Sequence, residues 1–134
     1  MNCRIVDSAE QMQPEDIVRL LRTTYWADKR PAEQIEASVR NSDCFGVYAD
    51  GEERLVGFAR VISDRATTYY LCDVVIDPAY RGRGLGTALV SHIVSLPVYS
   101  GLRGILITRD AHALYRKFGF EVLNDRTMVR GLNC

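Results

Sequence analysis

The sequence lacks any excess of charge, and it lacks long apolar runs. Seventeen basic residues balance seventeen acidic ones, so no overall field favours nucleic acid or an anionic membrane. No segment approaches the ~18 consecutive apolar residues of a membrane-spanning helix, and the first residues show neither the basic nor the apolar region of a secretion signal. We therefore expect a cytoplasmic protein with no nucleic-acid partner and no membrane partner.

Metal-binding patterns are also missing. The four cysteines are scattered without C-x-x-C spacing, and neither His92 nor His112 has a partner at ligand spacing. The sequence therefore predicts reduced thiols and no metal site.

The chain does have the size and the apolar content of a folded domain. Its 134 residues are 47% hydrophobic, enough to bury a core without disulfides. Neither an internal repeat nor a Ser/Pro-rich linker interrupts it, so we predict one domain over residues 1–134.

Hydrophobic periodicity predicts the element order β-α-α-β-β-β-α-β-α-β-β. A strand at 69–77, a helix at 85–96 and a buried strand at 102–110 form a crossover that should be right-handed and parallel. The last two strands are expected within "FEVLNDRTMVRGL", residues 120–132. The fold class is α/β (α+β), with a mixed and mostly antiparallel central sheet.

The loop "RGRGLG", residues 81–86, joins that strand to that helix. Such a loop presents unpaired amides and the positive end of a helix, which together favour an anion. The alternative is a tight strand-to-helix turn that needs glycine for positive φ. The loop is not a P-loop, because it contains no lysine. It does not fit a dinucleotide fingerprint either, because Thr87 stands where the last glycine should be and three strands precede the loop.

Two segments together carry a family resemblance. "VVIDPAYRGRGLGTALV" resembles the acyl-CoA pyrophosphate loop of the GNAT-type N-acetyltransferases, and "ALYRKFGFEV", residues 113–122, is similar to their late "LY-x-x-x-GF" segment. The resemblance implies acetyl-CoA as co-substrate, with a diphosphate-binding loop and a strand that binds the pantetheine arm. The implied loop residues are Arg81, Gly82, Arg83, Gly84, Leu85, Gly86 and Thr87, and the implied strand residues are Val74, Val75 and Ile76.

The resemblance also implies the catalytic groups. Tyr115 would donate a proton to the leaving thiolate, and an amide near Val75 would polarise the thioester carbonyl. The alternative for Tyr115 is a core tyrosine whose hydroxyl is satisfied within the protein.

Asp73 is a carboxylate in an apolar strand, a costly position unless it is paired or functional. It is a candidate general base. Equally, it is a candidate ion-pair partner of Arg60, which would lower its pKa and make it a poor base.

The acceptor side is less defined. Tyr25 and Trp26 are expected to form an aromatic wall of the acceptor pocket, and Arg30 to hold a carboxylate. The alternative is that the two aromatic rings fill the core and Arg30 is a surface charge. The predicted activity is acetyl transfer to a primary amine of a small molecule or peptide, by direct attack in a ternary complex. The alternatives are a non-catalytic acyl-CoA-binding or regulatory module of the same fold and, against the zero net charge, a nucleic-acid binder. The short C-terminal end leaves little material over the acceptor site, so a homodimer is a possible way to complete it.

Overall fold

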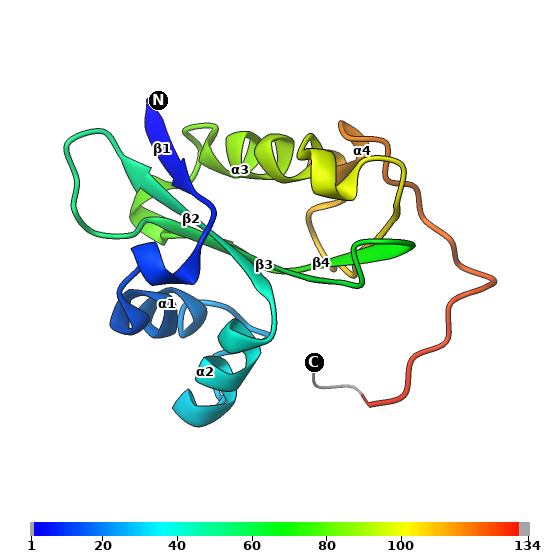
Figure 1. The fold of residues 1–134 in the computed structure, drawn as a ribbon, viewed down its shortest axis with the longest axis horizontal. Helices are drawn as coiled ribbons and strands as arrows, with labels where there is room; N and C mark the ends of the chain where they lie inside the picture. Colours follow the sequence, from blue (N-terminus) through cyan, green and yellow to red (C-terminus); the bar gives the residue numbers. More distant parts are fainter. Residues whose placement is uncertain (1, 132–134) are drawn as a thin grey trace.

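A five-stranded mixed sheet forms the centre of the computed structural model, which describes residues 2–131 (Figure 1). The strands are β1 (Cys3–Val6), β2 (Asp43–Ala49), β3 (Gly57–Ser63), β4 (Thr68–Ile76) and β5 (Arg103–Ile105), and they lie in sequence order. The first three pairings are antiparallel, and β4 pairs with β5 in parallel. The predicted fold class is therefore confirmed.

Helices cover both faces of the sheet. α1 (Pro14–Leu21) and α2 (Ala32–Arg40) lie on one face, while α3 (Leu85–Val94) and α4 (His112–Arg116) lie on the other (Figure 1). Three short 3-10 helices, η1 (Ala9–Gln11), η2 (Pro78–Tyr80) and η3 (Pro97–Tyr99), connect these elements. Among residues 2–131, no helix has the length and apolar character needed to cross a membrane.

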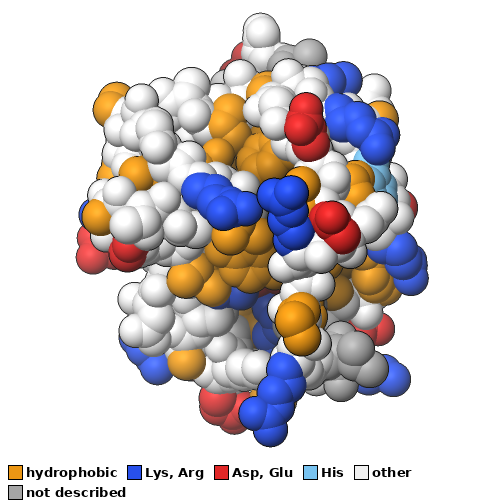
Figure 2. Space-filling model, turned by 90° about the vertical axis from the view of Figure 1, so that its right-hand side faces the viewer, with side chains coloured by type: hydrophobic (Ala, Val, Ile, Leu, Met, Phe, Trp, Pro, Cys, Tyr) orange, Lys and Arg blue, Asp and Glu red, His pale blue; other side chains and the backbone are white. Residues whose placement is uncertain are grey.

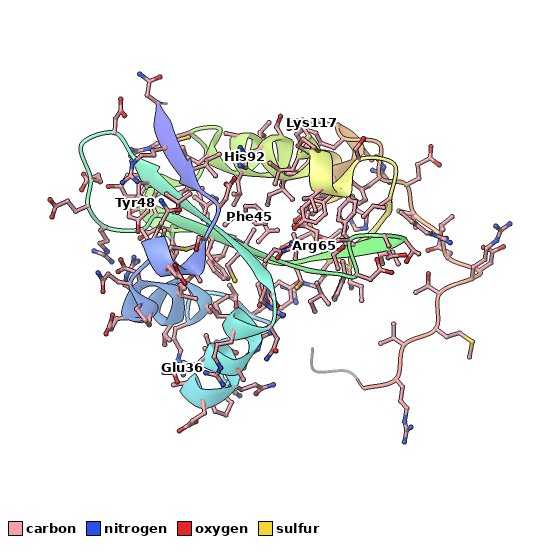
Figure 3. All side chains as sticks on the ribbon, in the orientation of Figure 1. Glu36, Phe45, Tyr48, Arg65, His92 and Lys117 are labelled. Carbon is pink, nitrogen blue, oxygen red and sulfur yellow. The ribbon has the colours of Figure 1, made fainter. Side chains whose placement is uncertain are left out.

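Alternation along the strands divides the core into two layers. In β2, Phe45 and Val47 pack toward α3, whereas Cys44 and Tyr48 pack toward α1 and α2. Figure 3 shows Phe45 between the sheet and α3. On the α3 side the helical contacts come from Leu85, Leu89, Val90, Ile93 and Tyr115, and on the other side from Ile17, Leu20, Leu21 and Ile35.

A bulge in β4 interrupts this alternation. Phe58 pairs with Val75 and Arg60 with Cys72, so one residue of β3 faces two residues of β4. Asp73 sits in the bulge with a φ of 54°. Leu71 consequently packs in the α3 layer and Val75 in the α1 layer, although residues four apart in a regular strand share a face.

The C-terminal part differs from the sequence prediction in two ways. The fifth strand, expected to be buried over 102–110, is only three residues long and partly exposed, because no described strand pairs with its outer edge. The two strands expected in residues 120–132 are also wrong over the described part, since residues 120–131 form neither helix nor strand. The final residue of that prediction, Leu132, lies outside the described residues.

Candidate active site

The glycine loop, residues 81–86, has two residues in the left-handed region. Gly82 has a φ of 77° and Gly84 a φ of 81°. A Cβ at either position would meet nothing within 4 Å, so conformation rather than space requires glycine. Gly84 is also the N-cap of α3 and provides no side chain to cap it. The first amides of α3, which like those of any helix have no intrahelical acceptor, therefore have no capping side chain either, and they lie at the positive end of the helix.

Two exposed arginines extend this positive region. The Arg81 Nε donates a hydrogen bond to the Ile76 carbonyl at 3.1 Å, which holds the side chain against the end of β4. The Arg83 guanidinium lies over the Tyr80 ring, 5.1 Å from its centroid. Free amides, a helix N-terminus and two guanidinium groups form a site whose chemistry fits a diphosphate.

The edge of β4 opens just before this loop. Parallel pairing with β5 reaches only Tyr70, although β4 continues to Ile76. The Asp77 amide donates to the Val56 carbonyl at 2.8 Å, toward β3. Because successive residues of a strand point in opposite directions, the amides of Val74 and Ile76 face the open edge. An extended ligand can hydrogen-bond to β4 there.

A cavity of about 670 Å³ lies where β4 and β5 separate. Its walls come from the segment between α1 and α2, from β4 and from the segment between β5 and α4, so it has access to both faces of the sheet. On the side of the molecule seen in Figure 2, apolar side chains gather at the centre, with Lys or Arg side chains beside them. The lining residues used below are Tyr25, Trp26, Arg30, Arg60, Asp73, Val74, Arg109 and Tyr115.

Asp73 is the centre of a buried polar cluster in this cavity. Its Oδ2 accepts from Arg30 Nη1 at 2.8 Å and from Arg60 Nε at 2.9 Å, and its Oδ1 accepts from Trp26 Nε1 at 2.9 Å. Burial acts to raise the pKa of Asp73, but the hydrogen bonds and charges of Arg30 and Arg60 outweigh it and hold the pKa below its ordinary value. The carboxylate is therefore ionised at neutral pH and weakly basic.

Tyr115 approaches the cavity from the opposite face of the sheet. Its side chain is 8% exposed and packs edge-on against Phe120, with ring centroids 6.0 Å apart. Its hydroxyl has no hydrogen bond to any of residues 2–131 in the structure. Burial, with smaller effects from Asp110 and Tyr25, raises the pKa of Tyr115 to about 12. The phenol keeps its proton at neutral pH, as a tyrosine of ordinary pKa also does.

The structure brings some predicted residues together and separates others. Tyr25, Trp26, Arg30, Asp73 and Tyr115 all line the cavity, whereas the glycine loop lies beyond the far end of β4. Arg30, expected to hold an acceptor carboxylate, is instead paired with Asp73.

Sequence reasoning missed Arg109, which lines the cavity with its guanidinium 3.7 Å from the Tyr25 ring centroid. Its position in "TRD", at the carboxyl end of the predicted strand 102–110, was the available signal, because ligands gather at the carboxyl ends of such strands.

Neither histidine contributes to the cavity. His92 on α3 lies 2.7 Å from Asp7, on the side of the molecule that carries β1 (Figure 3). No group of three or more metal-ligating side chains occurs within the described part of the chain.

Comparison with known proteins shows which family and which solved structures this chain resembles. Residues 11–120 match the model of the acetyltransferase (GNAT) family. The chain belongs to the GNAT family. A putative GNAT acetyltransferase from Xanthomonas campestris pv. campestris has the same fold with a TM-score of 0.90 and 36% identity, over 99% of this chain and 95% of that one. The predicted family resemblance is confirmed.

Two curated plant relatives are longer than this chain. The histone acetyltransferase TAP1 of Glycine max is 29% identical over 96% of this chain and 59% of its own length. The probable acetyltransferase TAP2 of the same organism is 30% identical over 78% of this chain and 46% of its own length. The chain thus spans roughly half of the curated relatives it matches.

Proposed function

We propose that this GNAT protein transfers an acetyl group from acetyl-CoA to a primary amine of a small molecule or peptide, by direct attack in a ternary complex. The observation that carries the proposal is the buried Tyr115 hydroxyl, which lacks a described protein partner and lines a cavity at the open edge of β4. The glycine loop, whose free amides and arginines suit a diphosphate, lies at the other end of that edge.

The donor would be held along β4. The amides from Gly82 to Thr87, with Arg81 and Arg83, would bind the diphosphate. The open-edge amides of Val74 and Ile76 would hydrogen-bond to the extended pantetheine. Val74 lines the cavity, so a donor that follows β4 from the glycine loop would bring its thioester end into the cavity.

Two groups of the chain would then serve the reaction. An amide of β4 would donate to the thioester oxygen as negative charge develops there. We assign this role to Val74 rather than Val75, because Val74 lines the cavity and its amide faces the open edge. Tyr115 would donate its proton to the sulfur as the carbon–sulfur bond breaks and the amine forms the new amide.

Asp73 would act as a positioning residue and not as a base. A carboxylate held ionised by two arginines has little affinity for the proton of the acceptor. Its hydrogen bonds instead fix Trp26 and Arg30 in the wall that the acceptor meets. The acceptor amine would lose its proton to solvent through the mouth of the cavity.

Tyr115→Phe tests the assignment. The variant should lower kcat by roughly 10²- to 10⁴-fold, the usual contribution of a general acid, while acetyl-CoA binds with unchanged affinity. Free thiol release measures turnover over a panel of amino acids, polyamines and lysine peptides; the peptides are included because one relative is named a histone acetyltransferase. Calorimetry measures binding.

Tyr25→Phe is the matched control, because it removes a hydroxyl from the same cavity without removing the proposed acid. An unchanged kcat in Tyr115→Phe would refute the acid role. Acetyl-CoA binding without turnover on any amine would instead support a non-catalytic acyl-CoA-binding or regulatory module.

A further inference from the structure

Arg109 brings a positive charge to the cavity that no acidic side chain of the described residues neutralises. It lies in the segment between β5 and α4, is exposed, and lines the cavity. Among residues 2–131, no carboxylate forms an ion pair with its guanidinium and no oxygen accepts a hydrogen bond from it. Arg30 and Arg60, the other arginines of the lining, are both paired with Asp73. The donors of Arg109 are therefore available to a bound anion.

A chain of contacts that begins at Asp73 holds the Arg109 side chain in place. Asp73 accepts a hydrogen bond from Trp26 Nε1 at 2.9 Å. Trp26 packs edge-on against Tyr25, with ring centroids 5.0 Å apart and an angle of 84° between the rings. The Tyr25 ring in turn carries the Arg109 guanidinium, 3.7 Å from its centroid. The guanidinium is thus positioned by an aromatic ring, and this contact uses none of its N–H groups as hydrogen-bond donors.

The formal charges that line the cavity leave an excess of one positive charge. Three arginines contribute, namely Arg30, Arg60 and Arg109, against two aspartates, Asp73 and Asp110. Polyamines and lysine-rich peptides carry several positive charges, so this balance disfavours them. It favours an acceptor that has a negative group beside its amine.

Asp110 gives the cavity the complementary negative charge near the proposed acid. Burial, followed by the charges of Asp110 and Tyr25, raises the pKa of Tyr115, so both residues lie within electrostatic range of its hydroxyl. Asp110 would attract the ammonium form of an acceptor toward Tyr115. Arg109 and Asp110 are consecutive, with Cα atoms about 3.8 Å apart. One short stretch of the wall thus presents both charges, which suits an acceptor whose amine and carboxylate are close together.

We propose that the acceptor is a free amino acid, whose carboxylate the Arg109 guanidinium binds while its amine faces Tyr115. This inference rests on the proposed function, because it names the acceptor of that reaction. A guanidinium can donate two parallel hydrogen bonds to the two oxygens of a carboxylate, a fit that a neutral carboxamide does not reproduce. The products would be the N-acetyl amino acid and coenzyme A as the free thiol. Arg109 is a specificity-determining residue in this assignment and takes no part in the proton transfer.

Arg109→Gln tests the assignment with matched pairs of acceptors. Each common amino acid is compared with its own carboxamide, which keeps the amine and the side chain but lacks the carboxylate. With the natural protein, kcat/KM for the preferred amino acid should exceed that for its carboxamide by roughly 10- to 100-fold, the effect expected of hydrogen bonds to one charged group. In Arg109→Gln the KM of the amino acid should rise by a similar factor with kcat nearly unchanged, and the preference should disappear.

Arg116→Gln is the matched control, because it makes the same change at an exposed arginine of α4 that does not line the cavity. It should keep the KM of the amino acid and the preference over the carboxamide. Arg109→Glu is a second variant, in which the reversed charge should favour a diamine over an amino acid of similar length. Circular dichroism checks that all three variants are folded, as expected for changes at exposed side chains.

Equal kcat/KM for amino acids and their carboxamides, or an unchanged preference in Arg109→Gln, would overturn this inference and leave the proposed activity standing. Turnover of no amine would instead contradict the proposed function, and a binding measurement then decides about the carboxylate site. Trp26 contacts Tyr25, so its fluorescence should report an amino acid that binds beside coenzyme A, which has no acyl group to transfer. Binding that is lost in Arg109→Gln supports the site, whereas no binding, or equal binding by both proteins, overturns it.

Discussion

Replacing Asp73 by asparagine removes one charge from the buried cluster and hardly changes its shape. In the natural protein the carboxylate accepts hydrogen bonds from Arg30, Arg60 and Trp26 at 2.8 to 2.9 Å. The side chains of Asp73, Arg30 and Arg60 are only 3%, 8% and 13% exposed. An asparagine has one acceptor oxygen and one NH₂ group in place of the two carboxylate oxygens. Its NH₂ group would therefore face an N–H group of a neighbouring side chain, and no hydrogen bond could form there.

The expected loss of stability follows from the burial of the ion pairs that Asp73 makes with Arg30 and Arg60. Removing one partner of a buried ion pair typically costs about 3–5 kcal/mol, because the remaining charge stays buried. Arg60 keeps a hydrogen bond to the Ser42 hydroxyl at 3.1 Å, which softens the loss. We therefore expect Asp73→Asn to lower the free energy of unfolding by about 3 kcal/mol at neutral pH, near the lower end of that range.

The difference in unfolding free energy between the natural protein and Asp73→Asn should decrease only at acidic pH. The pKa of Asp73 is lowered in the folded protein by the two arginines that offset its burial. The stabilisation is therefore fully present above the carboxyl's unfolded pKa, ~3.9, and is lost as the pH falls through the still lower folded pKa. The gap between the two proteins should stay constant across neutral pH and narrow only at strongly acidic pH.

Urea unfolding measures the difference in unfolding free energy between the two proteins. Circular dichroism and the fluorescence of Trp26, the single tryptophan, monitor the transition. Asp125→Asn is the matched control, because the Asp125–Arg126 pair is about four-fifths exposed and 3.8 Å apart; it should leave stability unchanged. The reasoning is refuted if Asp73→Asn is as stable as the natural protein. If instead Asp73→Asn keeps its stability and loses the acidic limb of the pH–rate profile, Asp73 is a general base.

Two further predictions concern the glycine loop and the proposed acid. Gly84→Ala should lower the free energy of unfolding by roughly 1–2 kcal/mol, because alanine disfavours a φ of 81°. Gly86→Ala is the control and should not lower it. Gly86 lies in the first turn of α3, and a Cβ there would make only an ordinary 3.7 Å contact with Ile76. Urea unfolding of the two variants tests this pair, and equal losses would contradict it. The pKa of Tyr115 is raised to about 12, so ionisation of Tyr115 should not reduce the turnover rate near pH 10. A pH–rate profile measures this. A decline near pH 10 in the natural protein that is absent in Tyr115→Phe would contradict the assignment.

The glycine loop was predictable because its geometry is local. Three glycines between an apolar strand and an apolar helix require a turn with positive φ, and Gly82 and Gly84 adopt it. The direction of the following helix then places free amides at the end of the strand. No contact from elsewhere in the chain is needed to specify this arrangement, so the short stretch contains the information for it.

The surroundings of Asp73 were only half predictable. An aspartate in an apolar strand indicates a partner, and Arg60 on the neighbouring strand was a reasonable candidate. Simple alternation, however, places Asp73 on the same face as Leu71, away from Trp26 and Arg30. The bulge reverses that direction. It depends on how β4 pairs with β3, so the periodicity of β4 alone contains no trace of it.

The observed β5 is shorter than the strand predicted over residues 102–110, and this difference bears on the function. The apolar segment 102–110 predicts a strand long enough to pair with β4 well beyond Tyr70. Such a strand would hydrogen-bond to the β4 edge at Val74 and Ile76 and close the cavity between the two faces. The bulge turns Asp73 toward α1 and α2, and α4 brings Tyr115 from the opposite face, so these groups share one cavity only where β4 and β5 have parted. In the proposed function, the lost strand pairing is the structural condition for a donor that lies along β4 and an acid that reaches its end.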